Sequence, residues 1–315
     1  MKEPTGYLLS KFLINKDKFF QALAKKMINK KPLVSICCTT YNLEKYIKAA
    51  LDGFLTQKGN LIDEIIIYDD ASSDNTVKII REYAKKYPNL IFPIFQKENQ
   101  YTKGIQPMVD IIFPKTRGKY IALCDGDDYW TDPYKIQKQV NFLEKNKDCA
   151  GCFHHTQTIY EKDGKKGKIY GKNDDKLFLT SEDTISILSL MATSSYVFRR
   201  ESLVIPKDFY RGVSYDMAVC SLIAAKGKWG CIPEIMSVYR KHEKNVTSDV
   251  SVNKNYHKER IQLIGYLNKY HEFRYDKKAK KVIEYHKSKQ FFLNRIKRKI
   301  KFIIFTLKRL VKNVI

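Results

Sequence analysis

Residues 34–42 read VSICCTTYN, an apolar run of strand type that leads directly into polar residues. Three further apolar runs follow, and segments long enough for a helix separate them. The predicted strands are Leu33–Cys38, Glu64–Tyr68, Leu90–Phe95 and Lys119–Cys124, and the amphipathic stretches between them lie near 44–56, 74–87 and 104–113. Short apolar strands that alternate with helices predict a βαβ series. We therefore expect an α/β fold with a Rossmann-like open sheet that binds its ligand at the carboxyl ends of the strands.

The regular alternation fades after about residue 149, and the second half of the chain reads as a mixed region. Its predicted strands are Cys152–Tyr160, Ser194–Phe198 and Gly230–Tyr239, its predicted helices lie near 181–190 and 215–226, and residues 251–289 read as polar helices. The loop Glu161–Asp175 is rich in Lys, Gly and Asp, so we expect an exposed flap or insertion there.

Polar clusters follow three of the four predicted strands, at the point where each strand ends. They are Thr39–Asn42, the pair Asp69 and Asp70, and Asp125–Trp130. Five acidic side chains at one edge repel one another unless a cation or hydrogen-bond donors share them, and hard divalent cations prefer such oxygen ligands. Any one of these acids alone would be read as a turn or helix-cap residue. Together they predict a site for Mg²⁺ or Mn²⁺.

Glycine-rich phosphate loops are absent from the sequence. It contains no GxxxxGK[ST] string and no GxGxxG after the first strand. The sequence therefore lacks the motifs that are typical of P-loop kinases and dinucleotide oxidoreductases. A phosphate group would then be bound mainly through the metal. A cation that bridges a diphosphate neutralises the charge that builds up as the diphosphate leaves. This chemistry indicates a nucleotide-sugar substrate.

Four strings, in this order, resemble the motifs of family 2 glycosyltransferases. They are VSICCTTYN at 34–42, IIIYDDASSDNT at 65–76, YIALCDGDDYWTDP at 120–133 and VYRKHEKNVTS at 238–248. The resemblance covers roughly residues 32–250 and implies an inverting enzyme of the GT-A fold, a mixed sheet flanked by helices. It is strongest to bacterial members that build capsule, lipopolysaccharide and other envelope glycans, where ENQY, here at 98–101, also recurs. Two positions depart from the family pattern: Thr39 replaces a proline, and Gly126 replaces an alanine or serine.

The resemblance implies a donor site built from the first two clusters. Thr39, Tyr41 and Asn42 would line the nucleotide pocket. Asp70, assisted by Asp69, would contact the base or the ribose. The implied substrate is a nucleoside-diphosphate sugar, with UDP as the commonest nucleotide in the family.

The third cluster contains the DxD motif of the family, formed here by Asp125 and Asp127. Asp127 would bind the metal directly and Asp128 would support it through hydrogen bonds or water, although the assignment among the three acids stays open. His242 would complete the metal site or touch the diphosphate. Arg240 would neutralise the leaving group.

An inverting transfer needs a carboxylate that takes the proton from the attacking hydroxyl, and Asp216 is the candidate. The family carries this acid in a Glu-Asp pair, whereas the preceding residue here is Tyr215. The alternative is that Asp216 only caps the helix that follows it.

The acceptor side is less well defined. Ser194, Ser195 and Arg199 resemble the acceptor-side strand of the family, or they are structural. Trp130 would either stack on a sugar or pack in the core. The implied acceptor is a lipid-linked or growing glycan of the cell envelope.

The chain carries a formal charge of +24, which is concentrated at its ends. Residues 1–31 contain eight Lys against two acids, and residues 277–315 contain fourteen Lys or Arg against Glu284 alone. We therefore divide the chain into a basic amphipathic segment (1–31), the glycosyltransferase domain (32–250) and a helical extension (251–315).

Residues 290–315 of this extension have the pattern of a basic amphipathic helix, which binds an anionic membrane surface. Its apolar stripe is Phe292, Ile296, Ile300, Ile303, Leu307, Leu310 and Val314. The alternative is a helix that packs on the catalytic domain or on a partner subunit. The N-terminal segment either forms a second such helix or packs under the tail.

No apolar run is long enough to span a bilayer, and we expect no signal peptide. The expected location is therefore cytoplasmic, on the inner face of the cell membrane. Seven cysteines do not suggest a disulfide framework.

Two functions are alternatives to a glycosyltransferase: a nucleotidyltransferase, and a non-catalytic protein that binds sugar or nucleic acid. The acidic cluster argues against a nucleic-acid partner, and the oligomeric state stays open.

Overall fold

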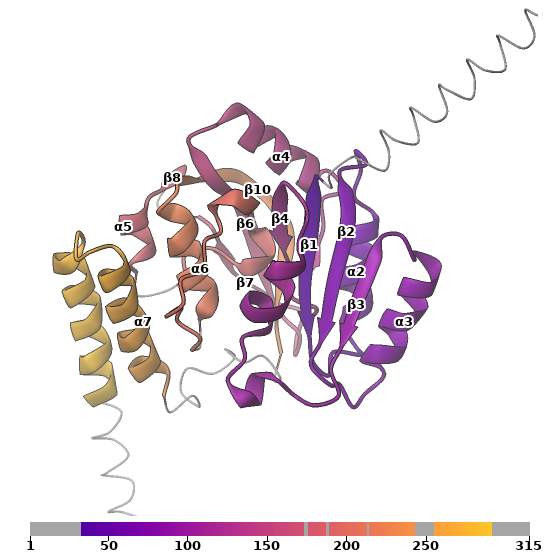
Figure 1. The fold of residues 1–315 in the computed structure, drawn as a ribbon, viewed down its shortest axis with the longest axis horizontal. Coiled ribbons are helices and arrows are strands. Elements are labelled where there is room, and N and C mark those ends of the chain that lie inside the picture. The colour runs from indigo at the N-terminus through magenta and orange to yellow at the C-terminus, as the bar shows by residue number, and fades with distance from the viewer. Residues whose placement is uncertain (1–32, 173–175, 187–188, 213, 243–254, 292–315) are drawn as a thin grey trace, which may run out of the picture.

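The computed structural model describes residues 33–172, 176–186, 189–212, 214–242 and 255–291. Its first half confirms the predicted βαβ series (Figure 1). The elements are β1 (Val34–Thr40), α2 (Ile47–Leu55), β2 (Ile62–Asp69), α3 (Thr76–Lys86), β3 (Ile91–Phe95) and β4 (Tyr120–Leu123). β1 pairs in parallel with β2 and β4, and β2 pairs in parallel with β3. The carboxyl ends of β1, β2 and β4 therefore meet at one edge of the sheet.

The second half extends the same sheet with one long parallel strand pair and several shorter antiparallel pairs. Its strands are β5 (Tyr129–Trp130), β6 (Cys149–Tyr160), β7 (Lys166–Tyr170), β8 (Phe178–Leu179), β9 (Val197–Arg199) and β10 (Lys228–Lys241). Its helices are α4 (Lys135–Lys145), α5 (Ser181–Thr184), α6 (Tyr215–Ala224), α7 (Tyr256–Tyr270) and a further helix over 276–291. The strand order is β3-β2-β1-β4-β9-β6-β10-β5, with β7 on β6 and β8 on β10. This is the mixed α/β sheet that was expected.

Several sequence predictions are wrong in detail. The stretch 104–113 holds a π-helix (Met108–Ile112) and a 3-10 turn (Phe113–Lys115) in place of an α-helix, because Pro114 lacks the amide that a regular helix needs. The helix predicted at 181–190 ends at Thr184, and beyond it the Ser186 carbonyl accepts a hydrogen bond from Arg260 of α7.

The structure also differs from the predictions at Glu161–Asp175 and Ser194–Phe198. The first is exposed as expected over most of its described length, but it contains β7, which folds back on β6. In the second, a 3-10 turn occupies Thr193–Ser195, and the strand begins only at Val197. The polar helices predicted over 251–289 are confirmed by α7 and the helix at 276–291.

Alternate residues of the parallel strands enter two hydrophobic clusters, one on each face of the sheet. Ile36 belongs to the cluster that α2, α3 and α4 cover, whereas its neighbour Cys37 belongs to the cluster formed with the π-helix, α6 and α7. In Figure 1, α3 and α7 stand at opposite ends of the molecule. Burial on both faces explains why the sequences of the parallel strands are mostly apolar.

The two basic ends lie almost entirely outside the described residues. The segment 1–31 is not described, and the tail 290–315 is described only at its first two residues. The membrane interpretation and the three-part division of the chain therefore stay predictions. Within the described ranges, none of the helices has the length and apolar character needed to cross a bilayer.

Candidate active site

The loop after β1 and the turn after β4 meet at the carboxyl edge of the sheet. Cys37 of β1 pairs with Leu123 of β4, so the residues that follow the two strands are neighbours. The Thr39 hydroxyl donates a hydrogen bond to Asp125 Oδ1 over 2.6 Å, and the Gly126 amide donates to the Thr39 carbonyl over 2.9 Å. The first and third polar clusters of the sequence thus form one unit.

Tyr41 and Asn42 complete the loop after β1. Tyr41 is 48% exposed. Asn42 has a φ of 54°, in the left-handed region that asparagine tolerates, and its side-chain oxygen accepts a hydrogen bond from the Ser73 amide over 2.8 Å. The loop is therefore fixed against the β2–α3 connection and presents a tyrosine ring to solvent.

The carboxylates of Asp69 and Asp70, at the end of β2, both accept several hydrogen bonds. Asp69 is fully buried and accepts from the hydroxyls of Thr40 and Ser72. Asp70 accepts from the amides of Gln100 and Tyr101, at 2.8 and 3.1 Å. These bonds hold the ENQY segment beside β2, and they relieve the repulsion that the sequence predicted at these two acids.

The turn after β4 concentrates three carboxylates, those of Asp125, Asp127 and Asp128. Burial, followed by the charge of Asp127, raises the pKa of Asp125 to about 7. The same two causes, in the same order, raise the pKa of Asp128 well above its usual range, although the Arg240 amide and Ser194 both donate hydrogen bonds to Asp128. The turn is a place where negative charge is costly, which is the condition under which a cation binds.

The end of β10 faces this turn. β5 pairs with β10 through Tyr129 and Val238, and this pairing carries Arg240 and His242 to the acidic residues. Arg240 Nη1 lies 3.2 Å from the Asp127 carbonyl, and His242 Nε2 lies 3.1 Å from Asp127 Oδ2. Both residues predicted from the fourth motif therefore reach the third.

Asp216 lies in the first turn of α6, after Ser214, whose φ of 65° turns the chain into the helix. Burial raises the pKa of Asp216, and the nearby Arg260 of α7 opposes this shift. The charge of Asp216 is also one of the causes that raise the pKa of Asp125. The structure thus brings Asp216 within electrostatic range of the acidic turn.

The sequence model of a family described as glycosyl transferase family 2 matches residues 35–203, which is more than half of the chain. The chain belongs to glycosyltransferase family 2. A protein of Mycobacterium tuberculosis, described as uncharacterized, is 39% identical over 216 residues, covering 66% of this chain and 59% of that relative. The chain therefore spans about three fifths of the length of this relative. A Bacillus subtilis protein named as a teichuronic acid biosynthesis glycosyltransferase is 33% identical over 127 residues, 40% of this chain and 48% of the relative.

Solved structures show that the family 2 domain has the GT-A fold. Staphylococcus aureus TarS in complex with UDP-GlcNAc superimposes with a TM-score of 0.57 at 14% identity, over 74% of this chain and 65% of that one. The mannosyltransferase PcManGT of Pyrobaculum calidifontis, in complex with GDP-Man and Mn²⁺, gives a TM-score of 0.52 at 16% identity, over 82% of this chain and 74% of that one. At these identities the likeness concerns the fold alone.

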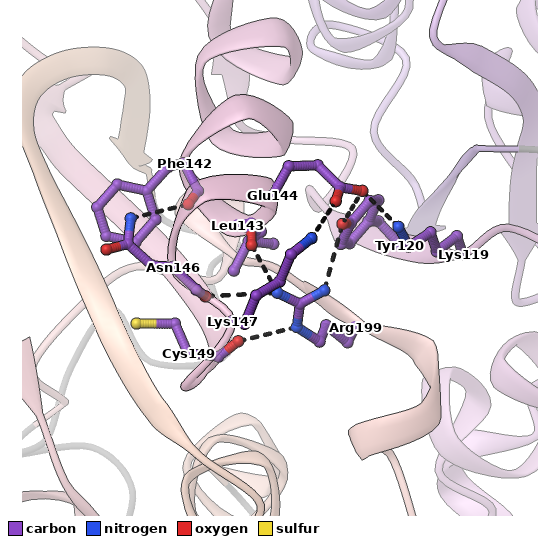
Figure 2. A network of polar contacts seen from close by, with 9 residues as sticks. All are labelled: Lys119, Tyr120, Phe142, Leu143, Glu144, Asn146, Lys147, Cys149 and Arg199. Atoms are coloured by element: carbon purple, nitrogen blue, oxygen red, sulfur yellow. Dashed lines mark hydrogen bonds and ion pairs between the residues drawn. The ribbon is translucent and has the colours of Figure 1, made fainter.

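Three residues predicted on the acceptor side of this family 2 domain do not gather at the acidic turn. Arg199 ends β9, where it pairs with Tyr120 at the start of β4, and it donates to the carbonyls of Cys149, Leu143 and Asn146 (Figure 2). The guanidinium therefore satisfies carbonyls at the end of α4.

The other two are buried in the body of the domain. Trp130 is 4% exposed, packs edge-on against Phe54 and donates to the Ser194 carbonyl, so the structure supports core packing over sugar stacking. The Ser195 hydroxyl donates to the Ala192 carbonyl. Ser194 alone of the predicted acceptor group reaches the acidic turn, through Asp128.

Sequence reasoning on this family 2 domain missed Tyr46, Arg260 and Lys135. Tyr46 stacks on His242, and Arg260 contacts Met217 beside Asp216. Lys135 is fully buried, with its ammonium 4.0 Å above the Trp130 ring, and burial lowers its pKa to about 7. Tyr46 lies in a stretch predicted only as amphipathic, Arg260 lies on a predicted polar helix, and no element was predicted at Lys135, so no local pattern marked them.

The acidic turn and the end of β10 together offer two ligands for a divalent cation but not a complete set. Across the described parts of the chain, no three His, Cys, Asp or Glu side chains form a metal-binding group. Asp127 and His242 nevertheless offer an oxygen and a nitrogen ligand side by side, next to two carboxyls with raised pKa values. This donor set suits Mg²⁺ or Mn²⁺ only if the substrate supplies further oxygen ligands.

Proposed function

We propose that the chain is an inverting glycosyltransferase that moves a sugar from a nucleoside-diphosphate sugar to a hydroxyl group of a cell-envelope glycan. The observation that carries the proposal is the meeting of Asp127 with Arg240 and His242, in electrostatic range of the half-buried carboxyl of Asp216. Such a transfer needs positive charge beside the departing diphosphate and a base that takes the proton of the incoming hydroxyl.

Thr39, Tyr41 and Asn42 would hold the nucleotide in this proposal. The exposed ring of Tyr41 offers a surface for the base, and the hydrogen bond between Thr39 and Asp125 fixes the loop beside the acidic turn. Asp70 and Asp69 would contact the base or ribose from the end of β2. UDP is the proposed nucleotide, in line with the UDP-GlcNAc bound by TarS.

Asp127, Asp128 and His242 would hold Mn²⁺ or Mg²⁺ in the donor complex. The Mn²⁺ in the PcManGT complex supports a divalent cation in the donor complex. Such an ion would supply positive charge to the leaving diphosphate. Arg240 supplies a second positive charge from the protein itself, and its backbone amide keeps Asp128 in place.

Asp216 is the proposed base. The acceptor oxygen forms a bond to the anomeric carbon while the bond from that carbon to the diphosphate oxygen breaks, and the hydroxyl proton passes to Asp216. Because the attack comes from the face opposite the diphosphate, the anomeric configuration inverts. Burial raises the pKa of Asp216 and so makes it a better proton acceptor than an ordinary carboxylate.

The envelope glycan as acceptor rests on the relative named for teichuronic acid biosynthesis. A lipid-linked acceptor fits the basic tail 290–315, which would place the enzyme on the cytoplasmic face of the membrane. No nucleic-acid partner is proposed.

Calorimetric titration with UDP, GDP, CDP and dTDP, each with and without Mn²⁺, tests the donor site. One nucleotide is expected to bind, and EDTA is expected to weaken its binding at least about tenfold, because the acidic turn repels a diphosphate unless a cation lies between them. Binding of no nucleotide would refute the proposed function. Equal binding with and without metal would refute the role of Asp127, Asp128 and His242.

Deletion of residues 290–315 is expected to release the protein from vesicles that contain anionic lipid, because basic side chains near such a surface each contribute about 1 kcal/mol. Co-sedimentation with anionic and with neutral vesicles measures the change, and nucleotide affinity should stay the same. If the truncated protein sediments as before, the tail does not anchor the chain.

A further inference from the structure

Tyr46 lies immediately before α2 and contacts three residues around the proposed diphosphate site. Its ring is 8% exposed and stacks on the imidazole of His242, with 4.5 Å between ring centroids and 25° between planes. The guanidinium of Arg240 lies 5.3 Å from the centre of the same ring. The Tyr46 hydroxyl donates a hydrogen bond to Glu161.

These contacts join two parts of the sheet that are distant in sequence. Tyr46 lies in the connection between β1, which contains Thr39, and α2, four residues after Asn42. Arg240 and His242 come from the end of β10. Glu161 follows β6, and its amide donates to the carbonyl of Lys241 over 2.9 Å. One side chain thus contacts both the nucleotide-loop half and the β6–β10 half of the site.

The ring and the hydroxyl contribute in different ways. The ring face attracts the guanidinium of Arg240, which also lies 4.4 Å from the Tyr129 ring, so two aromatic rings hold this cation. The hydroxyl, at the far end of the ring, donates its hydrogen bond to Glu161.

We propose that Tyr46 is a positioning residue with two roles. Its ring fixes Arg240 and His242 for the donor diphosphate, and its hydroxyl links the first residue of the β6–β7 turn, Glu161, to the same site. The inference rests on the proposed function, because it assumes that a nucleoside diphosphate binds beside Asp127. It goes beyond that function by assigning a role to a residue that contacts no substrate.

Nucleotide affinity and backbone exchange test the two roles separately. Tyr46→Met removes the ring but keeps much of the volume, and Tyr46→Phe removes only the hydroxyl. Tyr83→Met is the matched control, since Tyr83 is a half-buried tyrosine whose hydroxyl also donates to a carboxylate, Asp52, on α2. Calorimetry uses UDP, GDP, CDP and dTDP with Mn²⁺, and hydrogen–deuterium exchange is followed without nucleotide.

Tyr46→Met is expected to weaken nucleotide binding about tenfold or more and to speed exchange in 238–242 and 158–161. Tyr46→Phe should speed exchange in 158–161 only and change affinity less than about threefold, and Tyr83→Met should alter neither. Unchanged affinity and exchange in Tyr46→Met would overturn the proposal, and an equal loss in Tyr46→Phe would overturn the role of the ring. If wild type binds no nucleotide, the proposed function fails, while the exchange data still decide whether Tyr46 positions the end of β10.

Discussion

Replacing Asp216 with asparagine is expected to lower turnover by about 10²–10⁴-fold and to leave nucleotide affinity within about twofold. Asparagine keeps the shape of the side chain but cannot accept the proton of the attacking hydroxyl. It also carries no charge, and because burial already disfavours the ionised form of Asp216, the variant should fold at least as well as wild type. Release of nucleoside diphosphate from the nucleotide sugar, with water as acceptor, measures turnover, and calorimetry measures affinity.

The pH dependence of turnover gives a second test of Asp216. A base acts only when ionised, so wild-type turnover should fall as the pH drops through its pKa. Burial raises that pKa and Arg260 opposes the shift, so the acidic limb should lie above the ordinary range of an aspartate. Asp208→Asn, which changes an exposed acid that pairs with Lys269 of α7, should leave both the limb and the turnover unchanged. Unchanged turnover in Asp216→Asn would mean that this residue only caps α6.

The parallel half of the fold could be predicted because each strand is buried on both faces. Leu33–Cys38 and Lys119–Cys124 are mostly apolar runs, and the structure places β1 and β4 there. The antiparallel half was harder, since β5 and β8 are two residues long and form only by pairing with β10. No local pattern encodes a strand that its partner defines.

The acidic turn could be predicted for the same reason, because the end of a parallel strand fixes where the next residues lie. Asp125 and Thr39 are 86 residues apart, yet the pairing of β1 with β4 brings them into hydrogen-bond contact. The role of Arg199 could not be predicted. Its partners are backbone carbonyls near the end of α4, and only the packing of α4 on β9 brings them together.

Replacing Asp127 with asparagine is expected to abolish the effect of Mn²⁺ on nucleotide binding and to lower turnover by about 10²–10³-fold. Asp127 is the acid that contacts His242 directly, and its carbonyl contacts Arg240, so it stands where cationic groups and a diphosphate would meet. Calorimetry with and without Mn²⁺ measures the first effect, and release of nucleoside diphosphate measures the second. Asp208→Asn again serves as the control.

Although Asp127→Asn should weaken nucleotide binding and turnover, it should make the folded protein more stable near neutral pH. With its pKa raised to about 7, Asp125 takes up a proton on folding, so its contribution to stability is complete below about pH 4 and is lost as the pH rises through 7. The charge of Asp127 is the second cause of that raised pKa, after burial. Asp127→Asn should therefore lose less stability than wild type between pH 4 and 7, as thermal denaturation across this range would show.

Opposite changes in stability and binding separate a functional role of Asp127 from a structural one. A variant that merely misfolds would lose both its stability and its affinity for the nucleotide. A site that accumulates negative charge in order to hold a cation must instead gain stability when one charge is removed and lose binding at the same time. If Asp127→Asn were less stable than wild type at pH 7 and still bound nucleotide in a metal-dependent way, the acidic turn would be a structural element of the sheet edge.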